Sequence, residues 1–420
     1  MSDSETQIQN TLSELKNRQN DDGSFDLYSG TNGAQITPND SNRAYLTAYV
    51  VNFLTIANEH GVTIPKNMQS RALDFLRNFA GTNITNESSA YAAAFAIYVA
   101  TRNGFITTSY IDSFEEYANK NIRDWQSTIM GTYIASSYKL LKQNQKADNL
   151  ISRYKPTKTT KFEYHDEFNN NIVNSAIYDY LQRTHFNAPA NYNNKLIIKY
   201  IDSGNYTSFT SGMIIMAMAD ANGDTSIQDI KIFADNSELP LNQSSGGIFA
   251  KIPNNINKLN VKCGNCNSDT PLFYTIFQSG MPKNITEYSA GLEVTREYYD
   301  INGNRITYGN VGDTITVKIF IRTRGRTEYA PNVVITDLLP GGFIANKISG
   351  EFDFAETRED RILIYTNASR QTQTITYTAE LGTAGEFQVP PIHAMAMNNP
   401  TIRASNGRGN KFTVLNAPVE

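Results

Sequence analysis

The spacing of apolar residues changes once along this chain, near residue 232, and that change limits what the chain can fold into. Before it, apolar side chains recur at the three- and four-residue spacing of a helix face. After Ser244 the period becomes two. In residues 313–322 (DTITVKIFIR), isoleucine and valine alternate with other residues, as in a half-buried strand. The sequence therefore predicts an all-α region followed by an all-β region, in separate domains.

The helical region is expected to form a ring of helical hairpins. Residues 91–100 (YAAAFAIYVA) are apolar nearly all round, as expected for a helix covered on both sides. Breakers such as Asn103-Gly104 and Asn222-Gly223 separate the helical segments. The spacing is about one helix–turn–helix pair per forty to fifty residues, which is typical of a ring or solenoid rather than a four-helix bundle. We therefore predict an α/α toroid, of the kind also found in terpenoid cyclases.

The β region is expected to be an antiparallel sandwich. Residues 374–381 (TITYTAEL) repeat the alternation, and residues 300–303 (DING) are typical of a hairpin turn after a strand over 292–299. Short strands with turn signals about every ten residues favour this architecture. The predicted domains are a helical toroid over 1–232, a short β segment over 233–285 and a β-sandwich over 286–420.

A turn near the N-terminus links the first helix to the helical region. The residues QNDDGSF (19–25) follow a short amphipathic helix. Asp22-Gly23 suits a tight turn, because glycine tolerates positive φ and aspartate can hydrogen-bond its own backbone. Phe25 would then cover an apolar face. Such a turn is compatible with a toroidal cyclase and with a toroidal domain that performs no cyclisation.

Composition excludes some functions. The chain has 420 residues and a net charge of −4, which gives no reason to expect nucleic-acid binding. No run approaches the roughly 18–20 apolar residues of a membrane span. The polar start has no apolar signal-peptide segment. Two interpretations follow: a cytosolic protein, or a piece of a longer secreted protein whose targeting segment lies upstream.

The two cysteines of the chain, Cys263 and Cys266, form the motif CGNC. Such a pair can be a redox centre, half of a zinc site or a small local disulfide. A structural zinc site needs four ligands, and the four histidines are far away in the sequence. We therefore favour a disulfide in a hairpin, or unreactive thiols, and predict no metal site.

The chemistry of a toroidal enzyme is not evident. A protonating cyclase uses an Asp-rich D-x-D-D cluster, but Asp21, Asp22 and Asp26 do not have this spacing. A protein prenyltransferase needs Asp, Cys and His ligands for zinc, but the helical half contains no cysteine. We therefore predict no catalytic residues, no cofactor and no enzymatic activity.

Several segments carry a resemblance to a known family. TDLLPGGF (336–343) together with VPPIHAMAM (389–397) is its most specific part. The β half resembles the final sandwich of bacterial alpha-2-macroglobulins, and FYTIFQSGMPKN (273–284) resembles the closing strand of the small β domain before it. The helical half resembles the later part of the thioester domain of that family, through LKNRQNDDGSFDLYSG (15–30), RAYLTAYVVNFLTIANEHGVTIP (43–65), RALDFLRNF (71–79) and SSAYAAAFAIYVATRNG (88–104).

The resemblance implies a part of a broad-spectrum endopeptidase inhibitor that traps proteases in the bacterial cell envelope. Its expected partners are target proteases and the upstream macroglobulin domains of the parent chain. Its expected location is the periplasm, with a membrane contact only through a lipid anchor of the parent. Tyr45 and Tyr49 are candidates for lining the thioester pocket, although an ordinary aromatic core explains their spacing as well.

The chain departs from the family pattern in two respects. The Cys-x-Glu-Gln thioester motif is absent, since both cysteines lie in CGNC. The resemblance also implies that the first helices of the toroid precede Met1, so we expect an incomplete ring. We favour a C-terminal portion of a longer protein over a branch that lacks the thioester. The alternative function is a secreted binding or adhesion module without inhibitory activity.

Overall fold

A computed structural model describes most of the chain. The described residues are 3–26, 41–81, 84–154, 168–189, 191, 194–203, 207–218, 230–244, 247–264, 276, 286–407, 409 and 411–416. Contacts divide the chain into two compact units, one with most of the helices and the first five strands, the other with the remaining strands. Each unit is described by itself.

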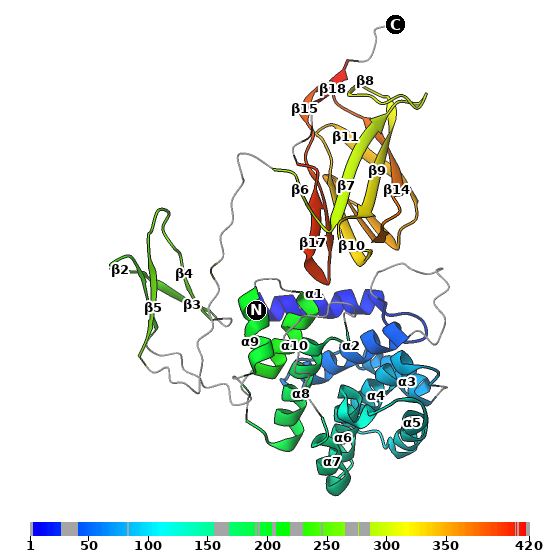
Figure 1. The fold of residues 1–420 in the computed structure, drawn as a ribbon, viewed down its shortest axis with the longest axis vertical. Helices are drawn as coiled ribbons and strands as arrows, with labels where there is room; N and C mark the ends of the chain where they lie inside the picture. Colours follow the sequence, from blue (N-terminus) through cyan, green and yellow to red (C-terminus); the bar gives the residue numbers. More distant parts are fainter. Residues whose placement is uncertain are drawn as a thin grey trace. The chain divides into compact units, whose positions relative to one another are not determined.

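The helices of the described residues precede all the strands (Figure 1). Their bounds are α1 Asp3–Arg18, α2 Ser41–Glu59, α3 Lys66–Gly81, α4 Glu87–Arg102, α5 Thr108–Asn121, α6 Ile129–Leu140, α7 Asn144–Ile151, α8 Asn171–Phe186, α9 Lys195–Ser203 and α10 Ser208–Met218, with a 3₁₀ turn at Trp125–Ser127. None of these helices is both long enough and apolar enough to cross a bilayer.

The even-numbered helices form an inner layer. Helix α4 is buried over nearly its whole length, and it packs against α2 on one side and α6 on the other, while α6 also packs against α8. The amphipathic helices α3, α5 and α7 cover this layer from outside, as each contacts one or two inner helices. The apolar composition of residues 91–100 therefore reflects a helix enclosed on all sides.

Helix α10 continues the inner layer back to α2. Arg183 of α8 donates to the carbonyl of Met216 in α10 at 2.6 Å. On the other side, a Cβ built on Gly212 would lie only 3.6 Å from the hydroxyl of Tyr49 in α2, so glycine permits this close approach. The inner helices thus follow one another around a ring, which confirms the predicted toroid class.

The turn at residues 19–25 fastens α1 to α3. Gln19 donates through Nε2 to the carbonyls of Gly23, at 3.0 Å, and Met68, at 2.8 Å. Gly23 has φ +89°, and a Cβ built there would lie 2.2 Å from the carbonyl oxygen of Arg71. Phe25 is 1% exposed. Glycine is therefore required both by the backbone conformation and by the contact with α3.

Short strands follow the helices. The last described helix ends at Met218 and the first strand begins at Ile230. One sheet has the order β2-β1-β5, and β3 and β4 form a hairpin. The bounds are β1 Ile230–Ala234, β2 Ser237–Glu238, β3 Leu241–Ser244, β4 Gly247–Ala250 and β5 Leu259–Cys263. The domain boundaries at 232 and 285 stay predictions.

The remaining strands form a sandwich whose two large sheets have the orders β12-β13-β10-β16-β17-β6 and β11-β14-β9-β7. A small sheet, β15-β18-β8, adjoins them. Their bounds are β6 Tyr288–Ala290, β7 Leu292–Tyr299, β8 Tyr308–Asn310, β9 Thr314–Thr323, β10 Tyr329–Leu338, β11 Phe343–Gly350, β12 Phe354–Thr357, β13 Arg361–Ser369, β14 Gln373–Leu381, β15 Gly385–Gln388, β16 Ile392–Ala396, β17 Asn399–Ser405 and β18 Lys411–Leu415.

The alternation read in the sequence matches the sandwich core. Ile315, Val317, Ile319 and Ile321 of β9 are all at most 2% exposed. The expected turn at residues 300–303 is also present, since Asp300 and Asn304 are hydrogen-bonded at 2.9 Å. The strand after this turn, β8, pairs in parallel with β18, whereas β7, the strand before it, pairs with β9. The predicted β-sandwich class is confirmed, and this pairing is a finding of the structure.

A polar cluster crosses the apolar core of the sandwich. Arg296 of β7 donates to the carboxylate of Asp337, to the carbonyl of Leu338 at 3.0 Å and to the carbonyl of Pro390 at 2.6 Å. The Tyr377 hydroxyl donates to the same carboxylate at 2.9 Å. Asp337 and Leu338 belong to TDLLPGGF and Pro390 belongs to VPPIHAMAM. Arg296 therefore hydrogen-bonds to both of the segments on which the family resemblance most depends.

Candidate functional site

Tyr45, one of the two predicted pocket residues, lies in an aromatic cluster near the N-terminal ends of the inner helices. It is 2% exposed. Its ring stacks on Tyr91 with a centroid distance of 5.2 Å, and it also contacts Phe95 at 4.9 Å and Phe168 at 5.0 Å. These rings come from α2, α4 and the segment before α8. The cluster therefore joins neighbouring inner helices, and a role in a thioester pocket stays a prediction.

Three tyrosine hydroxyls meet inside this cluster. The hydroxyl of Tyr45 is 3.5 Å from that of Tyr133 and 3.5 Å from that of Tyr91. Tyr91 also donates to the carbonyl of Phe168 at 2.8 Å. Burial raises the pKa of Tyr133 well above its usual value, so its phenol stays protonated. A neutral, enclosed phenol supplies neither a nucleophile nor a base.

Tyr49, the second predicted pocket residue, is half-buried on α2. Burial raises the pKa of its phenol. Its hydroxyl faces Gly212, the glycine that allows α10 to approach α2. Tyr45 and Tyr49 thus lie on the same helix but face different neighbours, and the assignment of Tyr49 to a pocket also stays a prediction.

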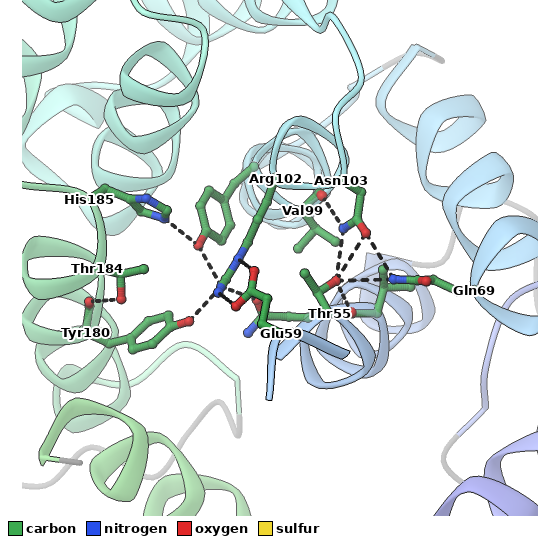
Figure 2. A network of polar contacts seen from close by, with 12 residues as sticks. Thr55, Glu59, Gln69, Val99, Arg102, Asn103, Tyr180, Thr184 and His185 are labelled. Atoms are coloured by element: carbon green, nitrogen blue, oxygen red, sulfur yellow. Dashed lines mark hydrogen bonds and ion pairs between the residues drawn. The ribbon is translucent and has the colours of Figure 1, made fainter. Parts of the chain in front are cut away.

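A polar cluster lies toward the C-terminal ends of the inner helices (Figure 2). Its centre is Arg102, the last residue of α4, whose side chain is 7% exposed. The guanidinium forms an ion pair with Glu59 at the end of α2, at 2.7 Å. It also donates to the hydroxyl of Tyr180 of α8 at 2.6 Å and to that of Tyr98 at 3.2 Å. We call these residues, together with His185, the Arg102 network.

The next residue, Asn103, extends the polar contacts to α3. Its Nδ2 donates to the hydroxyl of Thr55 at 3.0 Å and to the carbonyl of Val99 at 2.9 Å. Its Oδ1 accepts from Nε2 of Gln69 at 3.0 Å. Figure 2 shows these side chains converging from α2, α3 and α4. The end of α4 is therefore hydrogen-bonded to its neighbours on both sides.

His185 and Tyr98 of the network are each held in one protonation state at neutral pH. Burial, with a smaller contribution from the charge of Arg102, lowers the pKa of His185 to about 4. Burial also raises the pKa of Tyr98 far above its usual value. Nε2 of His185 lies 2.9 Å from the hydroxyl of Tyr98, which accepts from Arg102 and can therefore donate to the neutral imidazole. The arrangement suits a structural tie between helices rather than proton transfer.

The predicted cysteine pair is only partly described. Cys263 ends β5 and is disulfide-bonded. Cys266 lies outside the described residues, so the pairing of the two stays a prediction. No group of three or more His, Cys, Asp or Glu side chains that could hold a metal ion is found in the part of the chain that the structure describes.

Sequence reasoning missed the Arg102 network because its members are far apart along the chain. Tyr98 and His185 are 87 positions apart, and Arg102 and Tyr180 are 78 apart. A signal was available, since Arg102 is the one charged residue at the end of a long apolar segment. A buried cation at that place needs a carboxylate partner, but the pattern does not say which one.

A family model and curated relatives both relate this chain to bacterial alpha-2-macroglobulins. Residues 291–401 match the family described as the bacterial alpha-2-macroglobulin MG10 domain. An alpha-2-macroglobulin of Rickettsia conorii is 28% identical over 95% of this chain and 22% of its own length. An alpha-2-macroglobulin homolog of Yersinia pestis is 27% identical over 97% of this chain and 22% of its own length. The chain thus spans about a fifth of these curated relatives.

Solved structures show the same fold. A mutant of Salmonella alpha-2-macroglobulin has a TM-score of 0.72 and 16% identity, covering 99% of this chain and 28% of that one. Native Escherichia coli alpha-2-macroglobulin, from domain MG7 to the C-terminus, has a TM-score of 0.68 and 15% identity, covering 98% of this chain and 68% of that one. These relatives agree with the prediction that the chain is not an enzyme. In sequence and in fold, this chain is similar to the C-terminal region of bacterial alpha-2-macroglobulins, and its residues 291–401 match their MG10 domain.

Proposed function

We propose that this chain is part of a broad-spectrum endopeptidase inhibitor that traps proteases. The observation that carries the proposal is that a single relationship covers both halves of the chain: curated alpha-2-macroglobulins match it over 95% and 97% of its length. A helical ring and an MG10-type sandwich therefore occur here in the same order as in these relatives. The proposed activity belongs to the longer protein.

In this proposal the chain contributes mechanical parts and no chemistry. Trapping requires that cleavage of a bait region, outside this chain, changes the arrangement of domains around the protease. Such a change is effective if each domain moves as a rigid body. The Arg102 network and the Arg296 cluster support rigidity, because each joins several elements through satisfied buried polar contacts.

The proposed partners are target proteases, met by the full-length protein, and macroglobulin domains upstream in the parent chain. The proposed location is the periplasm or cell envelope, with a lipid anchor of the parent as its only membrane contact. We expect no nucleic-acid partner, in keeping with the net charge of −4.

The test uses the parent protein encoded by the whole gene, mixed with trypsin. Residual activity is measured on a large substrate, casein, and on a small chromogenic peptide. Trapping predicts that casein cleavage falls while peptide cleavage continues, because a small peptide still reaches the enclosed protease. The control is heat-denatured parent. Equal cleavage of both substrates at every ratio would refute inhibition and favour the binding or adhesion module.

A further inference from the structure

A groove of about 810 Å³ opens at one end of the C-terminal sandwich. It lies where β10 begins, where a turn joins β13 to β14, and where the chain passes from β11 to β12. Its volume is in the range of small-molecule sites. The lining residues are Tyr329, 350–353, 366–369 and 371–374.

The floor of the groove is held by hydrogen bonds between the two sheets. Gln373 of β14 donates through Nε2 to the hydroxyl of Thr366 of β13 at 3.0 Å, and to the carbonyl of Glu351. Thr366 is 2% exposed. The groove is therefore preorganised. Preorganisation reduces the conformational entropy that is lost when a ligand binds.

One wall carries a hydrogen-bonded carboxylate–amide pair. Nδ2 of Asn367 donates to Asp353 at 3.2 Å, and its Oδ1 accepts the backbone N–H of Asn332 at 3.1 Å. The N–H of Asp353 donates to the carbonyl of Tyr365 at 2.8 Å. Both side chains are thus oriented by the sheet. A fixed carboxylate is a strong acceptor for hydroxyl donors.

Another lining residue presents an aromatic ring. Tyr329, the first residue of β10, is 58% exposed. An exposed tyrosine offers an apolar face together with a hydroxyl that donates and accepts. A pyranose has the complementary surfaces, since one side of its ring exposes C–H groups while its rim carries hydroxyls.

The charged residues that line the groove are Glu351 and Asp353, both carboxylates, and its described lining contains no arginine or lysine. An anionic ligand is therefore disfavoured. The hydroxyls of a neutral ligand can donate to these carboxylates, and the ring of Tyr329 can supply an apolar contact.

We infer that this groove binds a neutral saccharide, with a sugar ring against Tyr329 and hydroxyls on the Asp353–Asn367 pair. The site needs only the C-terminal sandwich and does not depend on protease trapping. A groove open to solvent with few enclosed contacts gives weak binding, with a Kd of about 1 mM.

The test is titration of the 420-residue chain with maltotriose, cellotriose and chitotriose, followed by calorimetry and saturation-transfer NMR. We expect at least one trisaccharide to bind. Tyr329→Ala should weaken that binding about three- to tenfold, the range found for aromatic contacts. Asp353→Ala should weaken it by at least as much, because a charged acceptor is lost. The matched control is Tyr308→Ala, which removes a tyrosine that is 61% exposed on β8, outside the groove.

Three results would overturn the inference. The first is the absence of binding by every trisaccharide at about 20 mM, well above the expected Kd. The second is binding that Tyr329→Ala leaves unchanged, which would place the sugar elsewhere. The third is binding of an arginine-rich peptide, lost in Asp353→Ala, with no saccharide binding. Circular dichroism of each variant separates loss of the site from loss of the fold.

Discussion

Replacing Arg296 by methionine should destabilise the C-terminal sandwich strongly. Methionine has a similar length and no donor, so the change removes polar contacts while keeping much of the packing. It leaves the carboxylate of Asp337, whose side chain is 0% exposed, hydrogen-bonded to the Tyr377 hydroxyl but without its arginine partner. It also removes the donor from the carbonyls of Leu338 and Pro390.

The size of the effect follows from the burial of the pair. Removing one partner of a buried ion pair costs about 3–5 kcal/mol, because the other charge is left uncompensated. The side chains of Arg296 and Asp337 are 1% and 0% exposed, so solvent cannot replace the lost partner. The double variant Arg296→Met/Asp337→Leu removes both charges of this buried pair. It should therefore be more stable than either single variant.

Hydrogen exchange of the amides in β9 and β14 measures this stability, since the central strands of the sandwich exchange through its global unfolding. A loss of about 3–5 kcal/mol corresponds to exchange about 150- to 5,000-fold faster. The control is Arg322→Met, on β9, whose partner Glu293 lies on β7; these side chains are 45% and 27% exposed. An exposed pair is worth about 1 kcal/mol or less, so exchange should change less than tenfold.

Two outcomes would refute the reasoning. One is an Arg296→Met variant whose unfolding free energy lies within about 1 kcal/mol of the original, the size of an exposed pair. The other is a double variant no more stable than the single variants, since that result would assign the loss to packing rather than to an unpaired charge.

Three further predictions concern the helical unit and the disulfide. Gly23→Ala should destabilise the helical unit by about 2–4 kcal/mol in urea unfolding, because its Cβ would meet a backbone carbonyl of α3 at 2.2 Å. The control is Gly61→Ala, because Gly61 has φ +84° but a Cβ built there has nothing within 4 Å. It should lower the free energy of unfolding by only about 1 kcal/mol. Equal losses in the two variants would contradict the steric argument. Burial lowers the pKa of His185 from about 6.5 in the unfolded chain to about 4 in the fold. Protonation therefore favours the unfolded chain, and the free energy of unfolding should fall by up to about 2–3 kcal/mol as the pH drops from 6.5 to 4. Fluorescence of the buried Trp125 reports this unfolding. If the unfolding free energy of His185→Gln depended on pH as steeply as that of the original chain, the pH dependence could not be assigned to His185. Thiol titration under denaturing conditions without reductant should find no free cysteine; two titrating thiols would refute the predicted disulfide.

The sequence predicted much of the fold because its signals are local. A period of two over 314–321 is visible within one strand, and the burial of Ile315, Val317, Ile319 and Ile321 follows from it. The turn around Gly23 could be predicted for the same reason, since the turn residues are adjacent. The close contact of Gly23 with α3 could not, because it joins positions about fifty apart.

The polar sites depended on contacts that no local pattern encodes. Pro390 and Arg296 are 94 positions apart, and they meet only because the strands of the two sheets bring them together. The groove likewise combines Tyr329 with residues 350–353, 366–369 and 371–374 at the end of the sandwich. The sequence by itself determined the order of helices and strands, the sharp turn and the resemblance to bacterial alpha-2-macroglobulins. Tertiary packing alone decided which buried charges meet and where a groove opens, because those depend on distances between segments that are far apart in the chain.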